Sequence, residues 1–253
     1  MKFMNAFMNK ILRRNLMFNE KNSLVKFKLQ VLKKGFPAKN AVVFGDMYKV
    51  EGCYTKKCME FGCERVLLID TLETPNWLET RKKNPKINFY KGDFSNTLFM
   101  KSIQENFELG VVFDILLHQA PLLNTIHLML EKITKRICIV QPMLREQKFS
   151  NTLIYLPGNT NIDELYPLKE RNEEFKVFDV NEVNLAYWIW GMTPSFLTSV
   201  LKGEGFEIIY SQEFEDSPNK NWFWWGCVAE RKYHNMSHWS NHRTTKDLYF
   251  PNW

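Results

Sequence analysis

The sequence has no apolar run that approaches the ~20 uninterrupted residues of a membrane-spanning helix, so it is not expected to cross a bilayer. It also has no Cys-x-x-Cys pair, and nothing at its start resembles a secretory signal with a cleavage site. Its five cysteines therefore predict a reduced, cytoplasmic setting. Hydrophobic residues make up 45% and charged residues 25% of the 253 positions, which excludes wholesale disorder and a fibrous fold.

Patterns that hold a metal ion are also missing. Three cysteines at five-residue intervals are spread around a predicted helix instead of being gathered into a zinc cage. Three histidines at four-residue intervals would share a helix face, but the first and third lie two turns of ~5.4 Å apart. These residues are Cys53, Cys58, Cys63, His234, His238 and His242. The sequence predicts no metal site, and residues 233–253 are predicted to form a polar, aromatic-rich tail.

The excess of positive over negative charge lies in the N-terminal part of the chain. Residues 1–36 carry nine Lys or Arg against the single acid Glu20, whereas the rest of the chain has a net charge of about −2. Apolar residues at three- and four-residue steps from Met4 to Leu12 predict an amphipathic helix in this basic arm. We expect the arm to pack on the body or on a second subunit of a homodimer, and docking on an anionic membrane surface is the alternative.

Short β-rich runs separated by helix-length stretches begin after the arm. The runs are nearly all apolar, as expected of strands that helices cover on both faces. They are residues 41–46, 65–70, 86–93, 113–118, 136–142, 206–211 and 222–230. Crossover helices are expected at 52–61, 76–83, 95–106 and 121–133, and another after Thr193. The sequence predicts an α/β, Rossmann-like domain over residues 37–232, with seven mostly parallel strands, helices on both faces and an antiparallel last strand.

Acidic residues end or follow three successive predicted strands. Asp46 follows the first strand, Asp70 ends the second and Asp93 follows the third. Ligands of open α/β sheets bind beyond the carboxyl ends of the strands. A carboxylate there can accept hydrogen bonds from both hydroxyls of a ribose or from the amine of adenine. The three acids therefore indicate a nucleoside ligand.

At these positions the sequence resembles the class I S-adenosylmethionine-dependent methyltransferases, over roughly residues 37–231. The resemblance rests on VVFGDMYKVEG (42–52), VLLID (66–70), YKGDF (90–94), FDILLHQAPLLN (113–124) and MTPSFLTSVLKGEGFEIIY (192–210). It implies S-adenosylmethionine as the cofactor. The residues it assigns to the cofactor are Asp46 and Gly52 at the methionine end, Asp70 with Thr71 beside it at the ribose, Asp93 and Phe94 at the adenine, and His118 with Gln119 near the sulfonium.

The loop after the first strand departs from the family pattern, which places glycines between an acid and a final glycine. Tyr48 and Val50 stand where the first two glycines belong. A β-branched valine disfavours positive φ, so the loop is expected to take a different path, with Tyr48 flanking the cofactor and Gly45 compensating in part. The alternative is a relative that has lost its cofactor.

The methyl acceptor is expected to be a small polar metabolite, such as a sugar or a phosphorylated intermediate of cell-surface polysaccharide synthesis. His118 is the candidate base for an oxygen or nitrogen nucleophile, and Gln119 is the candidate for orienting it. Residues 143–192 break the regular alternation of strands and helices and are predicted to form an insertion or lid. Candidate acceptor contacts near or within it are Arg145, Tyr187 and Trp188.

Two other functions are compatible with parts of the sequence. RNA methylation is an alternative, because four lysines of a predicted helix over residues 24–36 could meet phosphates. They are Lys26, Lys28, Lys33 and Lys34. A nicotinamide-dependent oxidoreductase is disfavoured, since no Gly-x-Gly-x-x-Gly follows the first strand.

Overall fold

The computed structural model describes residues 18–48, 50–119, 121–146, 151–155, 178–180, 183–185, 190–215 and 222–233. The apolar stripe of the arm, Tyr187, Trp188 and the three tail histidines lie outside these residues. Within the described residues, no helix has the length and apolar character needed to span a membrane.

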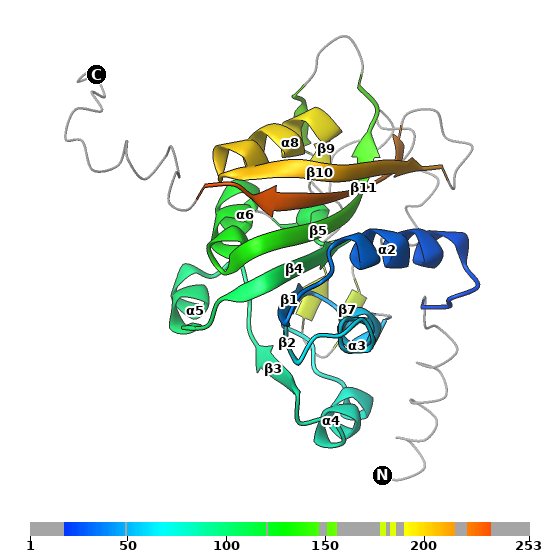
Figure 1. The fold of residues 1–253 in the computed structure, drawn as a ribbon, viewed down its shortest axis with the longest axis vertical. Coiled ribbons are helices and arrows are strands. Elements are labelled where there is room, and N and C mark those ends of the chain that lie inside the picture. Colours follow the sequence, from blue (N-terminus) through cyan, green and yellow to red (C-terminus); the bar gives the residue numbers. More distant parts are fainter. Residues whose placement is uncertain are drawn as a thin grey trace, which may run out of the picture.

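A seven-stranded sheet forms the centre of the molecule, in the order β10-β11-β5-β4-β1-β2-β3 (Figure 1). β1 to β5 pair in parallel, whereas β11 is antiparallel to both β5 and β10. The predicted fold class is therefore confirmed, and the last strand lies inside the sheet. The bounds are β1 Asn40–Phe44, β2 Arg65–Asp70, β3 Ile87–Lys91, β4 Phe107–Phe113, β5 Ile133–Leu144, β10 Phe206–Phe214 and β11 Trp222–Arg231.

Helices cover both faces of the sheet and create two apolar cores. α2, α3 and α4 pack on one face, and α5, α6 and α8 pack on the other (Figure 1). Successive residues of a strand point to opposite faces, so Val42 belongs to one core and Val43 to the other. The bounds are α2 Ser23–Lys34, α3 Cys53–Glu60, α4 Pro75–Lys82, α5 Thr97–Ser102, α6 Leu122–Glu131 and α8 Pro194–Gly203.

The position expected for the fourth strand is wrong. β4 occupies Phe107–Phe113, and the expected run 113–118 instead contains the 3-10 helix η1, Leu116–His118. Asp114, with a φ of 60°, turns the chain out of the sheet directly after β4. Gly110 interrupts the apolar run of β4, so the sequence pattern did not indicate a strand there. Packing requires a glycine at this position, because a Cβ would lie 2.2 Å from Cδ1 of Ile133.

The chain between β5 and α8 forms two short antiparallel ribbons in its described parts. β6, Leu153–Tyr155, pairs with β9, Trp190–Met192, and β7, Phe178–Val180, pairs with β8, Val183–Leu185. β9 also contacts η1, so the insertion approaches the carboxyl end of β4.

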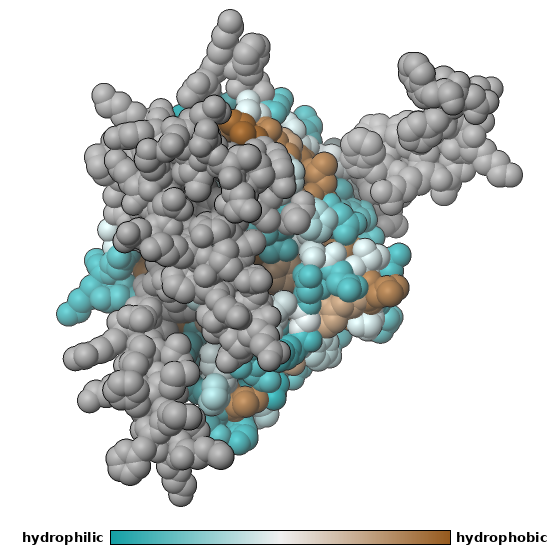
Figure 2. Space-filling view, turned by 180° about the vertical axis from the view of Figure 1, so that it is seen from behind, coloured by the Kyte–Doolittle hydropathy of each residue, from teal (hydrophilic) through white to brown (hydrophobic). Residues whose placement is uncertain are grey.

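A few large apolar residues are exposed on the described surface. On the face shown in Figure 2, the coloured hydrophobic areas are small and alternate with hydrophilic ones. Leu98 on α5 is 81% exposed and Leu123 on α6 is 55% exposed. Isolated apolar residues of this kind are ordinary on a protein surface and do not indicate a docking site.

Candidate active site

The carboxyl edge of the sheet brings together the acids that the sequence singled out. Asp70 ends β2, and Asp46 and Asp93 each lie two residues after the end of β1 and β3. Asp114 directly follows β4 and joins them at the same edge. These four side chains have different surroundings, which decide what each of them can do.

Asp46 is 2% exposed and is directed at the start of α3. Its Oδ1 accepts a hydrogen bond from the Tyr54 backbone N–H (3.3 Å), and its Oδ2 accepts from the Thr55 backbone N–H (2.6 Å) and hydroxyl (2.8 Å). Burial raises the pKa of Asp46 to about 7, against the opposing effect of these hydrogen bonds. Asp46 thus ties α3 to β1, and its assignment to the cofactor stays a prediction.

Asp70 is held from two sides by backbone donors. Its Oδ1 accepts from the Leu72 N–H (2.9 Å) and its Oδ2 from the Met47 N–H (2.9 Å). The residue is 8% exposed, and burial raises its pKa to about 6 despite these hydrogen bonds. The Thr71 N–H is a third backbone donor to this carboxylate, so little of its capacity of about four acceptor positions is left for a hydroxyl group in this conformation.

The loop after β1, residues 45–48 and 50–52, is called the first loop below. Positive φ occurs at Gly45 (69°), Glu51 (46°) and Gly52 (70°), whereas Tyr48 and Val50 are not among the described residues with positive φ. The loop therefore takes a path that avoids left-handed backbone at the two residues that replace glycines. A Cβ on Gly52 would lie 2.0 Å from the Trp77 ring, so this glycine is fixed both by its φ and by packing.

Phe94 and Asp93 behave differently at the end of β3. Phe94 is 6% exposed and packs edge-on against Phe44, with 5.7 Å between the ring centroids. Asp93 is exposed, and its Oδ1 accepts from the Ser95 N–H (2.8 Å). Asp93 can therefore take a further donor such as the adenine amine, whereas Phe94 is a core residue that covers Gly45 together with Ile115.

The predicted acceptor side is only partly described. His118 and Gln119 are half-buried in and after η1, and the Gln119 carbonyl accepts from the Trp190 indole N–H (2.7 Å). This hydrogen bond fastens the insertion to the segment that carries both residues. Arg145 is paired with Glu215 (2.6 Å), and its guanidinium lies 4.9 Å from the Phe223 ring centroid.

Sequence reasoning missed a partly buried charge pair at the end of β4. Lys28 of α2 is 6% exposed, donates to Oδ2 of Asp114 and lies 4.9 Å from the centroid of the Trp224 ring. Oδ1 of Asp114 is buried and has no hydrogen-bond partner among the described residues. The same holds for both amide atoms of Gln141 on β5. The sequence signal that could have revealed Asp114 is its position directly after the strand FELGVVF. The signal was missed because the strand was expected at residues 113–118.

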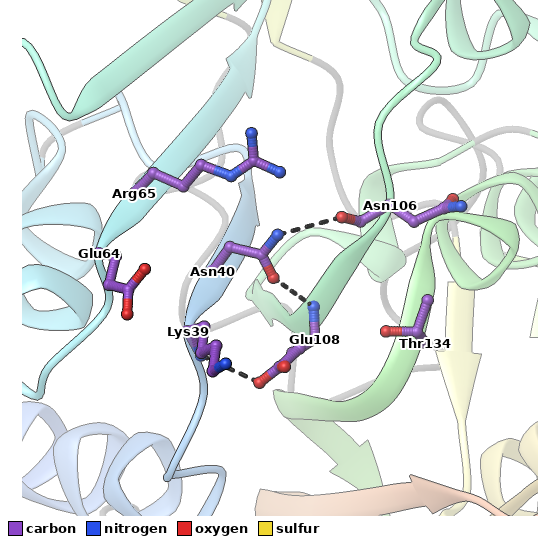
Figure 3. Close-up of a pocket in the computed structure, with 7 residues that line it drawn as sticks. All are labelled: Lys39, Asn40, Glu64, Arg65, Asn106, Glu108 and Thr134. Carbon is purple, nitrogen blue, oxygen red and sulfur yellow. Dashed lines mark hydrogen bonds between the residues drawn. The ribbon is translucent and has the colours of Figure 1, made fainter.

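A separate cavity of about 280 Å³ lies at the opposite, amino edge of the sheet. Figure 3 shows that polar side chains line it and that Asn40 bonds to Asn106 and Glu108. The Glu108 carboxylate also accepts from the Lys39 N–H (3.0 Å). These contacts join the starts of β1 and β4, far from the carboxyl edge, and so they stabilise the sheet without forming part of the candidate site.

No protein-family model matches the sequence, and a search of curated proteins finds no relative. Solved structures do match. One is the 1,6-didemethyltoxoflavin-N1-methyltransferase of Burkholderia thailandensis with S-adenosylhomocysteine bound, which matches with a TM-score of 0.57 at 14% identity. This match covers 90% of this chain and 87% of the Burkholderia chain. The magnesium protoporphyrin IX methyltransferase of Synechocystis PCC 6803 matches with a TM-score of 0.52 at 13% identity. This match covers 91% of this chain and 97% of the Synechocystis chain. The chain has the class I methyltransferase fold.

The described residues fit one half of the cofactor that this methyltransferase fold implies. Asp70 and Asp93 are carboxylates, the acceptor type that ribose hydroxyls and an adenine amine require, so these residue types suit the adenosine half, although the Met47 N–H occupies Oδ2 of Asp70 in this conformation. Asp46, which the resemblance assigns to the methionine half, is engaged by α3, and Ile115 fills the space above Gly45 so closely that a Cβ there would lie 2.2 Å from its Cδ1. In this conformation the Asp46 carboxylate and the space above Gly45 are therefore already occupied by the protein itself.

Proposed function

We propose that the protein is an S-adenosylmethionine-dependent methyltransferase that modifies an oxygen or nitrogen of a small polar metabolite. The observation that carries the proposal is the sheet order, with antiparallel β11 between β5 and β10, combined with a carboxylate at the end of β2. Neighbours of the same fold hold S-adenosylhomocysteine, which supports the same cofactor here.

Asp70 would hold the ribose and Asp93 the adenine. The cofactor, when bound, supplies a methyl group on a sulfonium that is already activated. The protein's contribution is therefore mainly to align the acceptor with that methyl group and to exclude water. His118 and Gln119, at the carboxyl end of β4, are proposed to orient the acceptor, with His118 taking its proton.

Two described polar groups support a polar acceptor. Oδ1 of Asp114, directly after β4, and the amide of Gln141, three residues before the end of β5, are buried without hydrogen-bond partners among the described residues. Leaving such groups unsatisfied costs about 1–3 kcal/mol each, which a bound ligand with donors and acceptors would recover. A sugar or phosphorylated intermediate of polysaccharide synthesis is the narrower proposal, and the five free cysteines favour a cytoplasmic setting.

Calorimetry with S-adenosylhomocysteine tests the proposal. We expect the wild-type protein to bind it and Asp70→Asn to bind about 10- to 100-fold more weakly, because a charge-assisted hydrogen bond is lost. Glu64→Ala is the matched control, since this exposed carboxylate lies at the amino edge and should not affect affinity. Incubation of the protein with methyl-labelled S-adenosylmethionine and sugar phosphates tests the acceptor.

A cofactor-free relative is the second candidate. It is favoured by Ile115, which covers Gly45, and by the Met47 N–H, which already bonds to Asp70. Absence of binding at millimolar S-adenosylhomocysteine, in a folded protein and in every variant tested, would establish this candidate and remove the first.

A further inference from the structure

We propose that the first loop is a latch over the cofactor site, fastened by the hydrogen bond between Asn76 and Glu51. The inference rests on the proposed function and concerns regulation of the same site. In the latched state, a backbone group of the loop occupies the carboxylate that would receive the ribose. Release of the loop then precedes cofactor binding.

The contact that closes the site is between Met47 and Asp70. The Met47 N–H lies 2.9 Å from Oδ2 of Asp70, and the Leu72 N–H takes the other oxygen. With 8% of the residue exposed, most of the carboxylate is covered. A ribose that bonds to both oxygens has to compete with the Met47 N–H for Oδ2 and with the Leu72 N–H for Oδ1.

Packing keeps the loop in this position. The Met47 side chain is 1% exposed and belongs to the same apolar core as Leu72 and Trp77, which follow β2. Gly52 lies directly against the Trp77 ring. The segments after β1 and β2 are thus packed together next to Asp70, whose carboxylate bonds to a backbone N–H of each segment.

Glu51 fastens the loop at its far end. Its Oε2 accepts from Nδ2 of Asn76 in the first turn of α4, and the residue is only 7% exposed. Its φ of 46° is unfavourable for a residue other than glycine. A buried carboxylate on a residue with strained backbone persists only where the surrounding structure holds it in place. Here the hydrogen bond from Asn76 holds Glu51 in place.

A latch makes a quantitative prediction about affinity. If the closed state dominates, the apparent affinity for the cofactor is reduced by the fraction of molecules that are open. Breaking the Glu51–Asn76 hydrogen bond should therefore tighten binding. A loop that instead braces the site, or a Glu51 that contacts the cofactor, predicts weaker binding for the same change.

The test uses the full chain and S-adenosylhomocysteine. Glu51→Ala removes the hydrogen bond, and Asn76→Asp sets two carboxylates against each other without disturbing the start of α4. We expect each to lower the calorimetric Kd by about three- to tenfold, the effect of one net hydrogen bond. Asn88→Asp makes the same chemical change on the exposed side of β3 and should leave the Kd unchanged.

Hydrogen exchange at the Met47 amide supplies a readout that needs no cofactor. This amide should be protected in the wild type and should exchange at least about threefold faster in Glu51→Ala and Asn76→Asp. Unchanged exchange in both variants overturns the latch. If the wild type binds and both variants have an equal or higher Kd, the latch is also overturned, but the proposed function is left intact. If no form binds, the proposed function fails and the latch fails with it, whereas binding by the variants alone supports both.

Discussion

The acids at the carboxyl edge show how the same side chain acquires different tasks from its neighbours. Asp46 is enclosed by donors at the start of α3, Asp70 lies between the segments after β1 and β2, and Asp93 is exposed. Asp114 faces a buried lysine. Sequence position alone predicted that three of these acids would share an edge, but their hydrogen-bond donors determine which of them is available to a ligand.

The pH dependence of stability should carry the signature of Asp46. Burial raises its folded pKa from 3.8 to about 7, so between these values the folded protein retains a proton that the unfolded chain has released. Stability from this group is therefore complete below about pH 4, falls as pH rises to about 7, and is level above. Asp46→Asn removes this dependence. In urea unfolding, the variant should gain about 2–4 kcal/mol relative to wild type between pH 4.5 and 7.5.

The exposed Asp93→Asn serves as the control for that measurement. A stability difference between Asp46→Asn and wild type that stays constant across the pH range would contradict the prediction.

Removal of the Lys28 charge should destabilise the protein through Asp114. Lys28→Met keeps the length of the side chain but leaves the carboxylate without its cation. A fully buried pair broken in this way costs about 3–5 kcal/mol, and we expect about 2–3 kcal/mol because the Asp114 side chain is 36% exposed. Equilibrium unfolding measures the loss, with exposed Lys26→Met as the control. Equal stability of the two variants would show that the pair contributes nothing.

At the scale of elements, six of the seven strands were predictable from their runs of apolar and β-branched residues, the pattern expected of strands covered by helices. β4 was misplaced because Glu108 and Gly110 interrupt its run, while the following FDILLH is more apolar. Packing against Ile133 selects glycine at position 110, and no local pattern reveals that contact. The path of the first loop was equally hidden, since it depends on Trp77 and Asn76 from a different element.

The junction between the first loop and α4 should tolerate no side chain at Gly52. Gly52→Ala would place a Cβ 2.0 Å from the rigid Trp77 ring at a φ of 70°. We expect a loss of about 2–4 kcal/mol in chemical unfolding, from overpacking and backbone strain together. Gly203→Ala, at the end of α8 with open space around it, should be nearly neutral. Similar losses for both variants would contradict this account of the junction.

For the whole molecule, the structure changes the meaning of the positive charge near the N-terminus. Of the four lysines on which the RNA alternative depends, Lys28 is paired with Asp114, whereas Lys26, Lys33 and Lys34 are exposed on α2. Three surface lysines on a body of slightly negative charge form a weak phosphate-binding surface. The RNA alternative has therefore lost one of its four supports.

We accordingly expect little affinity for RNA. Filter binding of a single-stranded RNA at low salt should show at most weak retention, because counterion release favours binding most strongly under that condition. Lys33→Glu combined with Lys34→Glu should then change little. Tight binding that falls steeply with added salt and is lost in this double variant would restore RNA as the substrate.

The interior position of β11 has a consequence for biosynthesis. Every strand from β1 to β5 can assemble as it leaves the ribosome, but β10 has no partner until residues 222–231 follow it. Until then, the growing polypeptide displays the open side of β5, the kind of bare edge on which chains aggregate. A chain that ends shortly before Trp222 would have most of the core but would lack β11, so the edge of β5 would stay unpaired. We expect chaperones and proteases to bind such a chain.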